Sequence, residues 1–329
     1  MTDYHGFLDA AVKAPRSIPV DALAGMLSCS DAAFGEDLFA AAREVKRLVG
    51  KAETLPRGLV ECSNVCAKDC LYCGIRKSNR KVSRYRLPES DVLVCIGEAR
   101  RRGYPAVAFQ AGEIESEENT RLYERLLANC RGLEVTLSLG EQTEEVYRRW
   151  KDAGAMRYLL RIETSNRRLY ATIHPPECSF DRRVECLRTL KRLGYVTGTG
   201  VMIGLPGQTA EDLARDIVFF ADLPADMVGM GPYIPHPDTP LPNLPNLPNL
   251  PNLPNRLSLS LRMIALTRLY LHDVNIVAAT ALEALDPEHG RERGIAAGAN
   301  VIMPNITPAE ARKSYDLYPG KAGDLRRET

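Results

Sequence analysis

Residues 62–73 read Cys-Ser-Asn-Val-Cys-Ala-Lys-Asp-Cys-Leu-Tyr-Cys, and Gly74 follows at once. Within this stretch Cys66, Cys70 and Cys73 form a C-x3-C-x2-C triplet. Three thiolates this close can converge on one point only if the chain loops around it, and cysteine thiolates are the usual ligands of iron–sulfur clusters. A [4Fe–4S] cube has four irons, so three local cysteines leave one iron open to a substrate or cofactor. The spacing therefore predicts an open iron–sulfur cluster.

Zinc and unligated cysteines are the two alternatives to a cluster. Zinc sites usually combine cysteine pairs, or a cysteine pair and histidines, across a longer insert. No second pair follows Cys73, and the next histidine along the chain is His174. Cys62 is close enough to the triplet for its role to stay open. The remaining cysteines are scattered and are expected to be small buried side chains: Cys29, Cys95, Cys130, Cys178 and Cys186.

The chain has the composition of a soluble globular protein. Its 329 residues are 45% hydrophobic and 26% charged, with a net charge of +1, which gives no argument for a nucleic-acid or membrane partner. No apolar run approaches the length that spans a bilayer, and residues 1–5 carry no secretion signal. We therefore expect a cytoplasmic protein.

Beyond residue 55, short apolar runs alternate with amphipathic helical segments. The strand-like runs are 58–61, 106–110, 134–139, 156–163, 197–203, 227–232, 275–280 and 300–303. The helical segments are 89–102, 118–130, 143–153, 180–193, 210–223, 257–270 and 283–297. This alternation predicts a (β/α)8 TIM barrel, with a doubly wound open sheet as the alternative.

The predicted organisation has three parts. Residues 1–54 form a helical extension, in which Asp31 could cap a helix that ends before Gly50. The barrel spans 55–321, and a tail covers 322–329. A Leu-Pro-Asn repeat at 241–255 interrupts the barrel between its sixth strand and sixth helix; its prolines forbid a helix, and we expect a loop expansion.

Polar residues at the C-terminal ends of barrel strands are candidates for the site. The second run ends in Gln110, Gly112 and Glu113, where the glycine permits close backbone approach and the glutamate could accept from an ammonium. The fourth run ends with Arg161 and Glu163, two apart and therefore on one face. A buried pair of this kind is costly unless it binds a ligand or forms a structural salt bridge.

Three further segments can each be interpreted in two ways, as part of a functional site or as ordinary structure. Arg183, at the start of a helix, could hold a carboxylate through two hydrogen bonds, or it could lie on a solvated face. The glycine-rich stretch around Gly200 and Met202 could expose backbone groups to a flat ligand such as adenine, or form a structural turn. The basic run 76–86 could be a solvated face or could steer an acidic electron donor toward the cluster.

The cysteine triplet, with Tyr72 just before its last cysteine, resembles the signature of the radical S-adenosylmethionine (SAM) superfamily. In that family SAM chelates the open iron, and an electron cleaves SAM to methionine and a 5′-deoxyadenosyl radical. Longer stretches resemble the HydE family of [FeFe]-hydrogenase maturases, within the biotin synthase-like group. They cover 63–66, 70–74, 84–86, 135–141, 158–161, 163–164, 204–209, 231–241, 299–305 and 317–321.

This resemblance implies roles for individual residues. Cys66, Cys70 and Cys73 would hold a single [4Fe–4S] cluster. SAM would contact Glu163 and Arg183, with Tyr72 and the glycines around Gly200 near its adenine. The substrate pocket would be lined by Thr136, Arg161, Thr280 and Tyr318. Gln110, Gly112, Glu113 and Met202 complete the predicted cofactor-binding set.

The implied substrate is a small cysteine-bound iron carbonyl–cyanide complex, made by HydG and passed on toward HydF. Reduced flavodoxin or ferredoxin is the implied electron donor. Ala279 departs from the family, which often carries a threonine there, and no second cysteine cluster follows residue 321. Two other functions stay open: a radical SAM enzyme acting on an amino acid or other small carboxylate, as methylornithine synthase and biotin synthase do, and an iron–sulfur scaffold without catalysis.

Overall fold

The structure, a computed structural model, describes residues 4–241 and 255–321. Within these residues the strands are β1 (Leu55–Ser63), β2 (Ala106–Ala111), β3 (Glu134–Ser138), β4 (Arg157–Leu159), β5 (Val196–Thr199), β6 (Met202–Ile203), β7 (Met227–Pro232), β8 (Asn275–Ala278) and β9 (Val301–Ile302). They run parallel in the order β5-β4-β3-β2-β1-β9-β8-β7, and β5 pairs with β7 to close a barrel. The predicted (β/α)8 barrel is confirmed, and the open sheet is wrong.

The single run predicted at 197–203 is two short strands, β5 and β6, both beside β7. The break falls at Gly200, where an added Cβ would collide with the carbonyl of Gly229. The fourth run is also shorter than predicted. β4 ends at Leu159, and the chain continues irregularly to Glu163, whose φ of 67° is outside the extended region.

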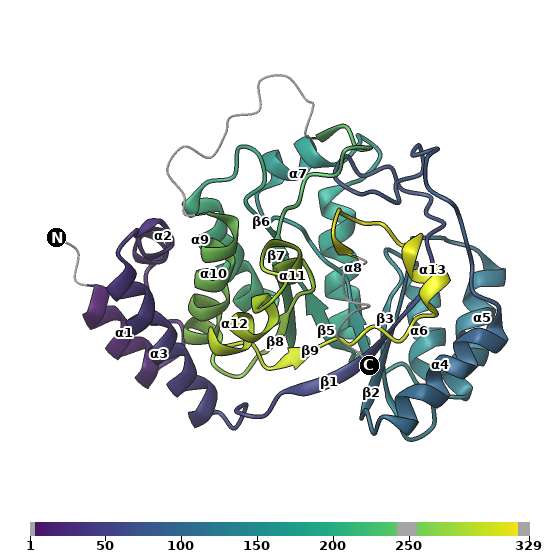
Figure 1. Cartoon of the computed structure of the whole chain (residues 1–329), viewed down its shortest axis with the longest axis horizontal. Helices are drawn as coiled ribbons and strands as arrows, with labels where there is room; N and C mark the ends of the chain where they lie inside the picture. The colour runs from purple at the N-terminus through teal and green to yellow at the C-terminus, as the bar shows by residue number, and fades with distance from the viewer. Residues whose placement is uncertain (1–3, 242–254, 322–329) are drawn as a thin grey trace.

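Helices cover the outside of the barrel (Figure 1). They are α4 (Glu89–Arg101), α5 (Glu117–Ala128), α6 (Glu144–Asp152), α7 (Arg167–Ile173), α8 (Phe180–Arg192), α9 (Ala210–Asp222), α10 (Arg256–Leu271), α11 (Ala281–Leu285), α12 (Gly290–Ala296) and α13 (Ala309–Lys313). The side chains of Ser116, Thr143, Ser179 and Thr209 cap the backbone N–H groups of the helices that follow them. The helix predicted at 283–297 is instead the pair α11 and α12, because Pro287 interrupts it.

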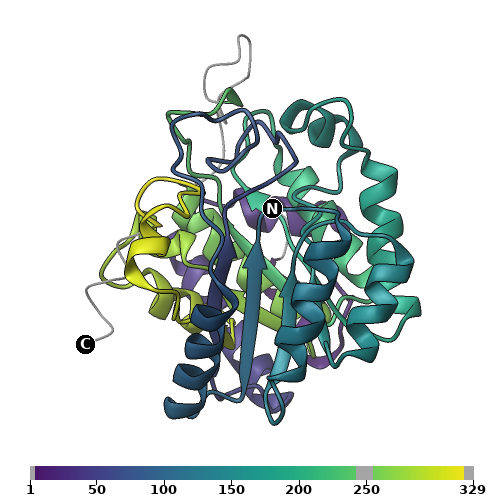
Figure 2. The ribbon, with the colours of Figure 1, turned by 90° about the vertical axis from the view of Figure 1, so that its right-hand side faces the viewer.

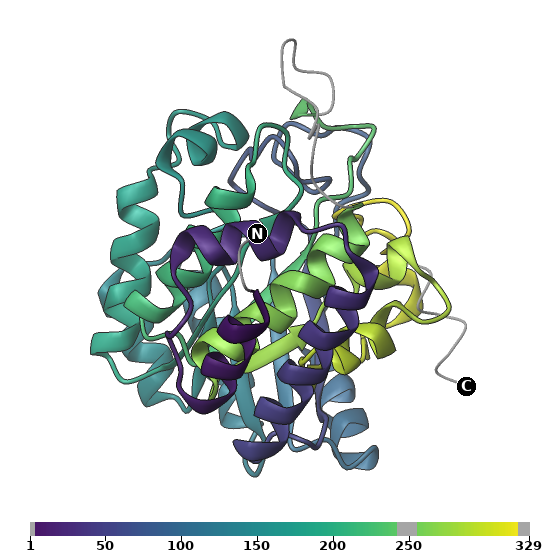
Figure 3. The same cartoon turned by 90° about the vertical axis from the view of Figure 1, so that its left-hand side faces the viewer.

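The segment before β1 is helical between residues 4 and 48. It contains α1 (Tyr4–Lys13), α2 (Val20–Ser28) and α3 (Ala32–Leu48). Asp31 caps α3, accepting from the backbone N–H of Ala33 at 2.8 Å. Figure 3 shows these helices lying across α9 and α10 on one side of the barrel, and contacts join α2 to α9 and α3 to α10.

Most of the core lies between the strands and the surrounding helices, where Tyr123, Tyr147, Trp150 and Tyr158 are fully buried and in ring contact. Figure 2 shows the loop after β1 above the strand ends, next to the C-terminal segment in yellow. The Leu-Pro-Asn repeat, apart from Leu241 and Asn255, and the predicted tail lie outside the described residues. No described helix is both long enough and apolar enough to cross a membrane.

Candidate active site

A cavity of about 330 Å³ opens at the C-terminal ends of the strands. It is lined by residues of β1, β2, β3, β4, β6, β7 and β8, by the loops that follow them, and by the C-terminal segment. The lining includes these predicted site residues: Cys66, Cys70, Tyr72, Cys73, Gln110, Gly112, Glu113, Arg161, Glu163, Arg183, Met202, Thr280 and Tyr318. The topology therefore brings together side chains that are up to 252 positions apart in the sequence (Cys66 to Tyr318).

Two predicted site residues lie elsewhere. Thr136, on β3, is fully buried, and its hydroxyl finds no hydrogen-bond partner among the described residues. Gly200 is buried against β7, and its carbonyl accepts from the backbone N–H of Glu163 at 2.9 Å. Neither belongs to the cavity lining. Gly200 contacts the cavity only indirectly, through its hydrogen bond to the lining residue Glu163. Thr136 lies inside the barrel and does not line the cavity.

The loop that carries the cysteines is fixed by its own backbone contacts. The backbone N–H of Glu113 donates to Cys66 Sγ at 3.3 Å, and the N–H of Ala67 donates to the Glu113 carbonyl at 2.8 Å. Gly112 lies against this loop so closely that an added Cβ would collide with the carbonyl of Val65. A residue without a side chain is required at that position.

The basic run after the loop is partly structural. Arg84 donates to the carbonyls of Asn64 and Ile75, each at 2.7 Å, and to two more in the same loop. Arg76 pairs with Asp69 at 2.6 Å. These two arginines therefore hold the cysteine loop together, and the solvated-face interpretation of the run does not apply to them.

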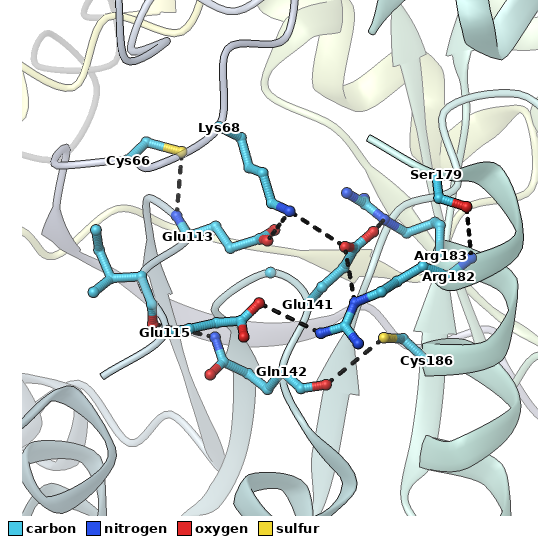
Figure 4. Close-up of polar contacts among 12 residues, drawn as sticks. Cys66, Lys68, Glu113, Glu115, Glu141, Gln142, Ser179, Arg182, Arg183 and Cys186 are labelled. Carbon is cyan, nitrogen blue, oxygen red and sulfur yellow. Dashed lines mark hydrogen bonds and ion pairs between the residues drawn. The ribbon is translucent and has the colours of Figure 1, made fainter. Parts of the chain in front are cut away.

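Beside the loop lies a network of buried charges, shown in Figure 4. Arg183 donates from Nε to Glu141 Oε1 at 2.6 Å and from Nη1 to the Arg161 carbonyl at 2.8 Å. Lys68, within the cysteine loop, donates to Glu141 Oε2 at 3.4 Å and lies 3.1 Å from Glu113 Oε1. Among the described residues no hydrogen bond reaches this buried Glu113 oxygen. It can therefore accept a bond from a ligand.

The network perturbs the titration of its members in opposite directions. Burial raises the pKa of Glu113, although Arg183 and Lys68 act to lower it. Burial would also raise the pKa of Glu141, but Arg183 prevails and lowers it. We attribute the difference to the direct hydrogen bonds that Glu141 accepts from both cations. Glu141 is thus the ionised anchor of the network.

Arg161 and Glu163 pair with each other across the cavity wall. Arg161 Nη2 lies 2.9 Å from Glu163 Oε2. Glu163 adopts a positive φ, and its backbone bridges to Val201. A non-glycine residue held in this sparsely populated backbone region destabilises the fold by about 1–3 kcal/mol, and such residues are often found at functional sites. Here the strained backbone turns the carboxylate toward the cavity and Arg161.

Tyr72 is held by a histidine that the sequence did not single out for a site role. Its hydroxyl lies 3.3 Å from His174 Nε2, while His174 Nδ1 lies 3.0 Å from the Tyr170 carbonyl. Because a carbonyl can only accept, Nδ1 carries the proton, and the Tyr72 hydroxyl donates to Nε2. Burial lowers the pKa of His174 to about 3, so the ring stays neutral.

The C-terminal segment, residues 314–321, completes the cavity. Tyr318 and Thr280 share a hydrogen bond between their hydroxyls at 2.7 Å. Lys321 pairs with Glu61 in the barrel interior and lies 4.7 Å from the centre of the Tyr315 ring. Glu61 has no solvent exposure. A buried carboxylate needs a positive partner, and Lys321 provides it.

Sequence reasoning missed the parts played by Lys68, Glu141, His174 and the Glu61–Lys321 pair. Lys68 and Glu141 had a positional signal, since one lies between two ligand cysteines and the other follows the end of a strand. The partner of each comes from a distant segment, which periodicity alone does not reveal.

The residues present suit the predicted cofactors. Three half-buried thiols line one cavity, and a backbone N–H donates to one sulfur, a contact typical of iron–sulfur sites. Arg183 offers a donor for a carboxylate, and Glu113 offers an acceptor for an ammonium, as the amino-acid part of SAM requires. No three His, Cys, Asp or Glu side chains in the described ranges are placed to hold a single metal ion.

Comparisons with known proteins agree with this geometry. The model of the Radical SAM superfamily matches residues 60–220. The chain is 43% identical over 316 residues to the [FeFe] hydrogenase maturase subunit HydE of Thermotoga maritima, covering 95% of this chain and 88% of that protein. It is 26% identical to 3-methylornithine synthase of Methanosarcina barkeri, over 85% and 78% of the two chains.

Solved structures show the same fold. Methylornithine synthase (PylB) has a TM-score of 0.80 at 23% identity and covers 90% of this chain and 85% of its own. The maturase HydG from Carboxydothermus hydrogenoformans has a TM-score of 0.76 at 18% identity, over 92% and 71% of the two chains. With the near full-length match above, these findings establish that the chain belongs to the radical SAM superfamily and, within it, to the family of the [FeFe] hydrogenase maturase subunit HydE.

Proposed function

We propose that this radical SAM maturase acts on a small cysteine-bound iron carbonyl–cyanide complex held in the barrel cavity. The observation that carries the proposal is the 43% identity to HydE over 95% of the chain. The family's cofactors are a [4Fe–4S] cluster and SAM. When bound, they supply reductive cleavage of SAM to methionine and a 5′-deoxyadenosyl radical.

In this proposal the charged side of the cavity binds the cofactors. Cys66, Cys70 and Cys73 hold the cluster, while Arg183 takes the SAM carboxylate and Glu113 its ammonium. Tyr72, Gln110, Gly112, Glu163 and Met202 surround the nucleoside, with Gly200 behind them. The support is that all but Gly200 line one cavity, that a buried Glu113 oxygen accepts no hydrogen bond among the described residues, and that the hydrogen bonds of Arg183 there use only Nε and Nη1.

The substrate lies on the other side of the cavity. Thr280 and Tyr318 line it there, and Arg161 reaches the substrate from the charged side, so a carboxylate of the substrate would meet a guanidinium and two hydroxyls. Thr136 enters this set only if its buried hydroxyl becomes accessible. Electrons come from a reduced flavodoxin or ferredoxin, and HydG and HydF are the proposed neighbours in assembly.

A second candidate is a radical SAM enzyme for an amino acid or another small carboxylate. Ala279 favours it, because a threonine is common there in the HydE family and its hydroxyl is missing here. The similarity to 3-methylornithine synthase adds support. A non-catalytic iron–sulfur scaffold is disfavoured, because such a protein binds no carboxylate ligand and therefore needs no buried arginine beside its cluster loop.

The test compares SAM cleavage with and without the complex. Reconstituted, reduced protein is given SAM, and nucleoside products are separated by chromatography, beside a Cys70→Ser variant. We expect Cys70-dependent cleavage, and with the complex present the 5′-deoxyadenosyl group should be recovered as an adduct of the complex in place of free 5′-deoxyadenosine. Cleavage that gives only free 5′-deoxyadenosine, whatever the complex, supports the second candidate. No cleavage by fully loaded, reduced protein refutes the enzyme.

A further inference from the structure

We propose that Glu141 is a positioning residue for SAM binding: it holds Arg183 in the orientation that receives the SAM carboxylate and ties it to the cluster loop. This inference rests on the proposed function, in which Arg183 binds that carboxylate. Glu141 itself does not line the cavity. It acts through the two cations that do, Arg183 and Lys68; a third cation, Arg182, lies 3.7 Å from Glu141 Oε2 and does not line the cavity.

The location of Glu141 suits this role. It follows Gly140, whose positive φ of 79° turns the chain at the end of β3, and its side chain is 2% exposed. An added Cβ on Gly140 would collide with the carboxylate of Glu113, so the Glu113 side chain packs against this turn. The turn places the Glu141 carboxylate between α8 and the cluster loop (Figure 4).

Its hydrogen bonds determine the direction of the arginine. A guanidinium is planar and rigid, so fixing two of its nitrogens fixes the third. Glu141 Oε1 engages Nε at 2.6 Å, and the Arg161 carbonyl engages Nη1 at 2.8 Å. The described residues offer no hydrogen-bond partner to Nη2. The network therefore fixes the direction of Nη2, the nitrogen that is left to donate to the SAM carboxylate.

The second oxygen of Glu141 reaches the cluster loop. Oε2 accepts from Lys68 Nζ at 3.4 Å, and Lys68 lies between Cys66 and Cys70. One carboxylate therefore holds both the loop and the arginine. Because SAM must meet the cluster and Arg183 together, their relative position matters: a displacement near 1 Å can cost about a hundredfold in rate.

A purely structural ion pair is the competing explanation, and two ligands separate it from a positioning role. SAM carries the carboxylate, whereas decarboxylated SAM (S-adenosyl-3-methylthiopropylamine) keeps the ammonium, sulfonium and nucleoside. A positioning defect weakens binding of SAM alone, while a general structural defect weakens both ligands equally. The readout is the ratio of the two dissociation constants, measured by calorimetry on anaerobic, cluster-loaded protein.

The central variant is Glu141→Met, which keeps the length of the side chain and removes the acceptor. We expect the preference for SAM to fall by about tenfold or more, which is the weight of one charge-assisted hydrogen bond. Glu141→Gln, which still offers an oxygen to Arg183 Nε, should recover most of the preference. The matched control is Glu115→Gln. Glu115 pairs with Arg182 at 3.4 Å in the same network, is 46% exposed and makes no contact with Arg183, so the ratio should not change.

Arg183→Met distinguishes failure of this inference from failure of the proposed function. If Arg183→Met keeps the preference for SAM, Arg183 is not the carboxylate ligand, and the roles proposed for Arg183 and Glu141 are both refuted, while the proposed function is still decided by the cleavage test. If Arg183→Met loses it while Glu141→Met keeps it, only the role of Glu141 is refuted. Equal weakening of both ligands in Glu141→Met also refutes it. Thermal unfolding and iron content show whether Glu141→Met folds and holds its cluster. If it does not, Glu141→Gln is the deciding variant. A loss of preference for SAM in Glu141→Gln as large as in Arg183→Met would refute positioning by the acceptor oxygen.

Discussion

The two sides of the cavity differ in chemistry. The side built from residues 60–220 presents thiols and a network of ion pairs that includes Lys68, Glu113, Arg161, Glu163 and Arg183. The side built from β7 to β9 contributes glycine, proline, alanine, valine and methionine, and among the described residues it adds no charged side chain to the lining. Its polar groups are hydroxyls such as that of Thr280.

The boundary between the two sides coincides with the reach of the family model, which ends at residue 220. In the proposed function the charged side binds the cluster and SAM, and the uncharged side faces the substrate. Changes on the first side should therefore abolish all chemistry, whereas changes on the second should alter which molecule is used.

The largest effect is expected from Cys73→Ser. A serine oxygen is a poor replacement for a thiolate on iron, so SAM cleavage should drop below detection and bound iron should fall. Iron analysis and chromatography of 5′-deoxyadenosine measure both. Cys62→Ser is the matched control: Cys62 is buried outside this cavity and should keep its iron and activity. Loss of both in Cys62→Ser would assign that cysteine to the cluster.

Gly112→Ala should have the next largest effect. The added methyl group collides with the Val65 carbonyl and lies 2.8 Å from Cys66 Cβ, so the cysteine loop must shift. We expect SAM cleavage to fall by about a hundredfold, with less iron per chain. Gly97→Ala adds the same methyl on α4, where nothing lies within 4 Å, and should change neither quantity. Normal cleavage in Gly112→Ala would show that the loop can yield.

A smaller effect, on stability, concerns a carboxyl behind the charged side. Asp216 on α9 is fully buried and accepts from Ser165 N and Oγ, each at 2.6 Å. Burial raises its pKa to about 7, above the value near 4 of an unfolded chain. Between these values the folded state binds more protons, so stability falls as the pH rises.

Asp216→Asn removes this penalty and keeps the acceptor. Its free energy of unfolding should rise relative to the unmodified protein by up to roughly 1.4 kcal/mol per pH unit between pH 4 and 7, and level off above pH 7. Chemical denaturation at several pH values measures the difference. Asp222→Asn, an exposed carboxylate on the same helix, should give no such trend. If the free energies of unfolding of Asp216→Asn and of the unmodified protein change with pH in parallel, the raised pKa of Asp216 is wrong.

The smallest effect is expected on the uncharged side. Ala279→Thr adds a hydroxyl beside Thr280 and should improve the KM of a carboxylate-bearing substrate by about threefold to tenfold, the weight of one hydrogen bond. The affinity for SAM should stay constant. Ala279→Val has the same shape without the hydroxyl and should give no gain. A change in SAM affinity in Ala279→Thr would show that the two sides are not independent.

Local order predicts the barrel, and most of the residues predicted for the site line its cavity, although Thr280 and Tyr318 were predicted through the family resemblance. Alternating apolar runs define strands and helices, and parallel strands bring their C-terminal ends together, which is why Gln110, Arg161 and Thr280 meet. Two features could not be read locally. Glu163 reaches the cavity through a positive φ, and β4 is consequently short. The carboxylate of Glu141 finds Arg183, 42 positions later, only in the folded chain.

The closing segment sets the order in which this cavity can be completed during synthesis. Lys321 meets Glu61 from 260 positions further along the chain. At roughly 5–20 residues per second, that separation is on the order of tens of seconds on the ribosome. Throughout that interval the cysteine loop exists without its C-terminal wall. The wall that contains Tyr318 and Lys321 is therefore the last part of the cavity to be synthesised, after every strand of the barrel.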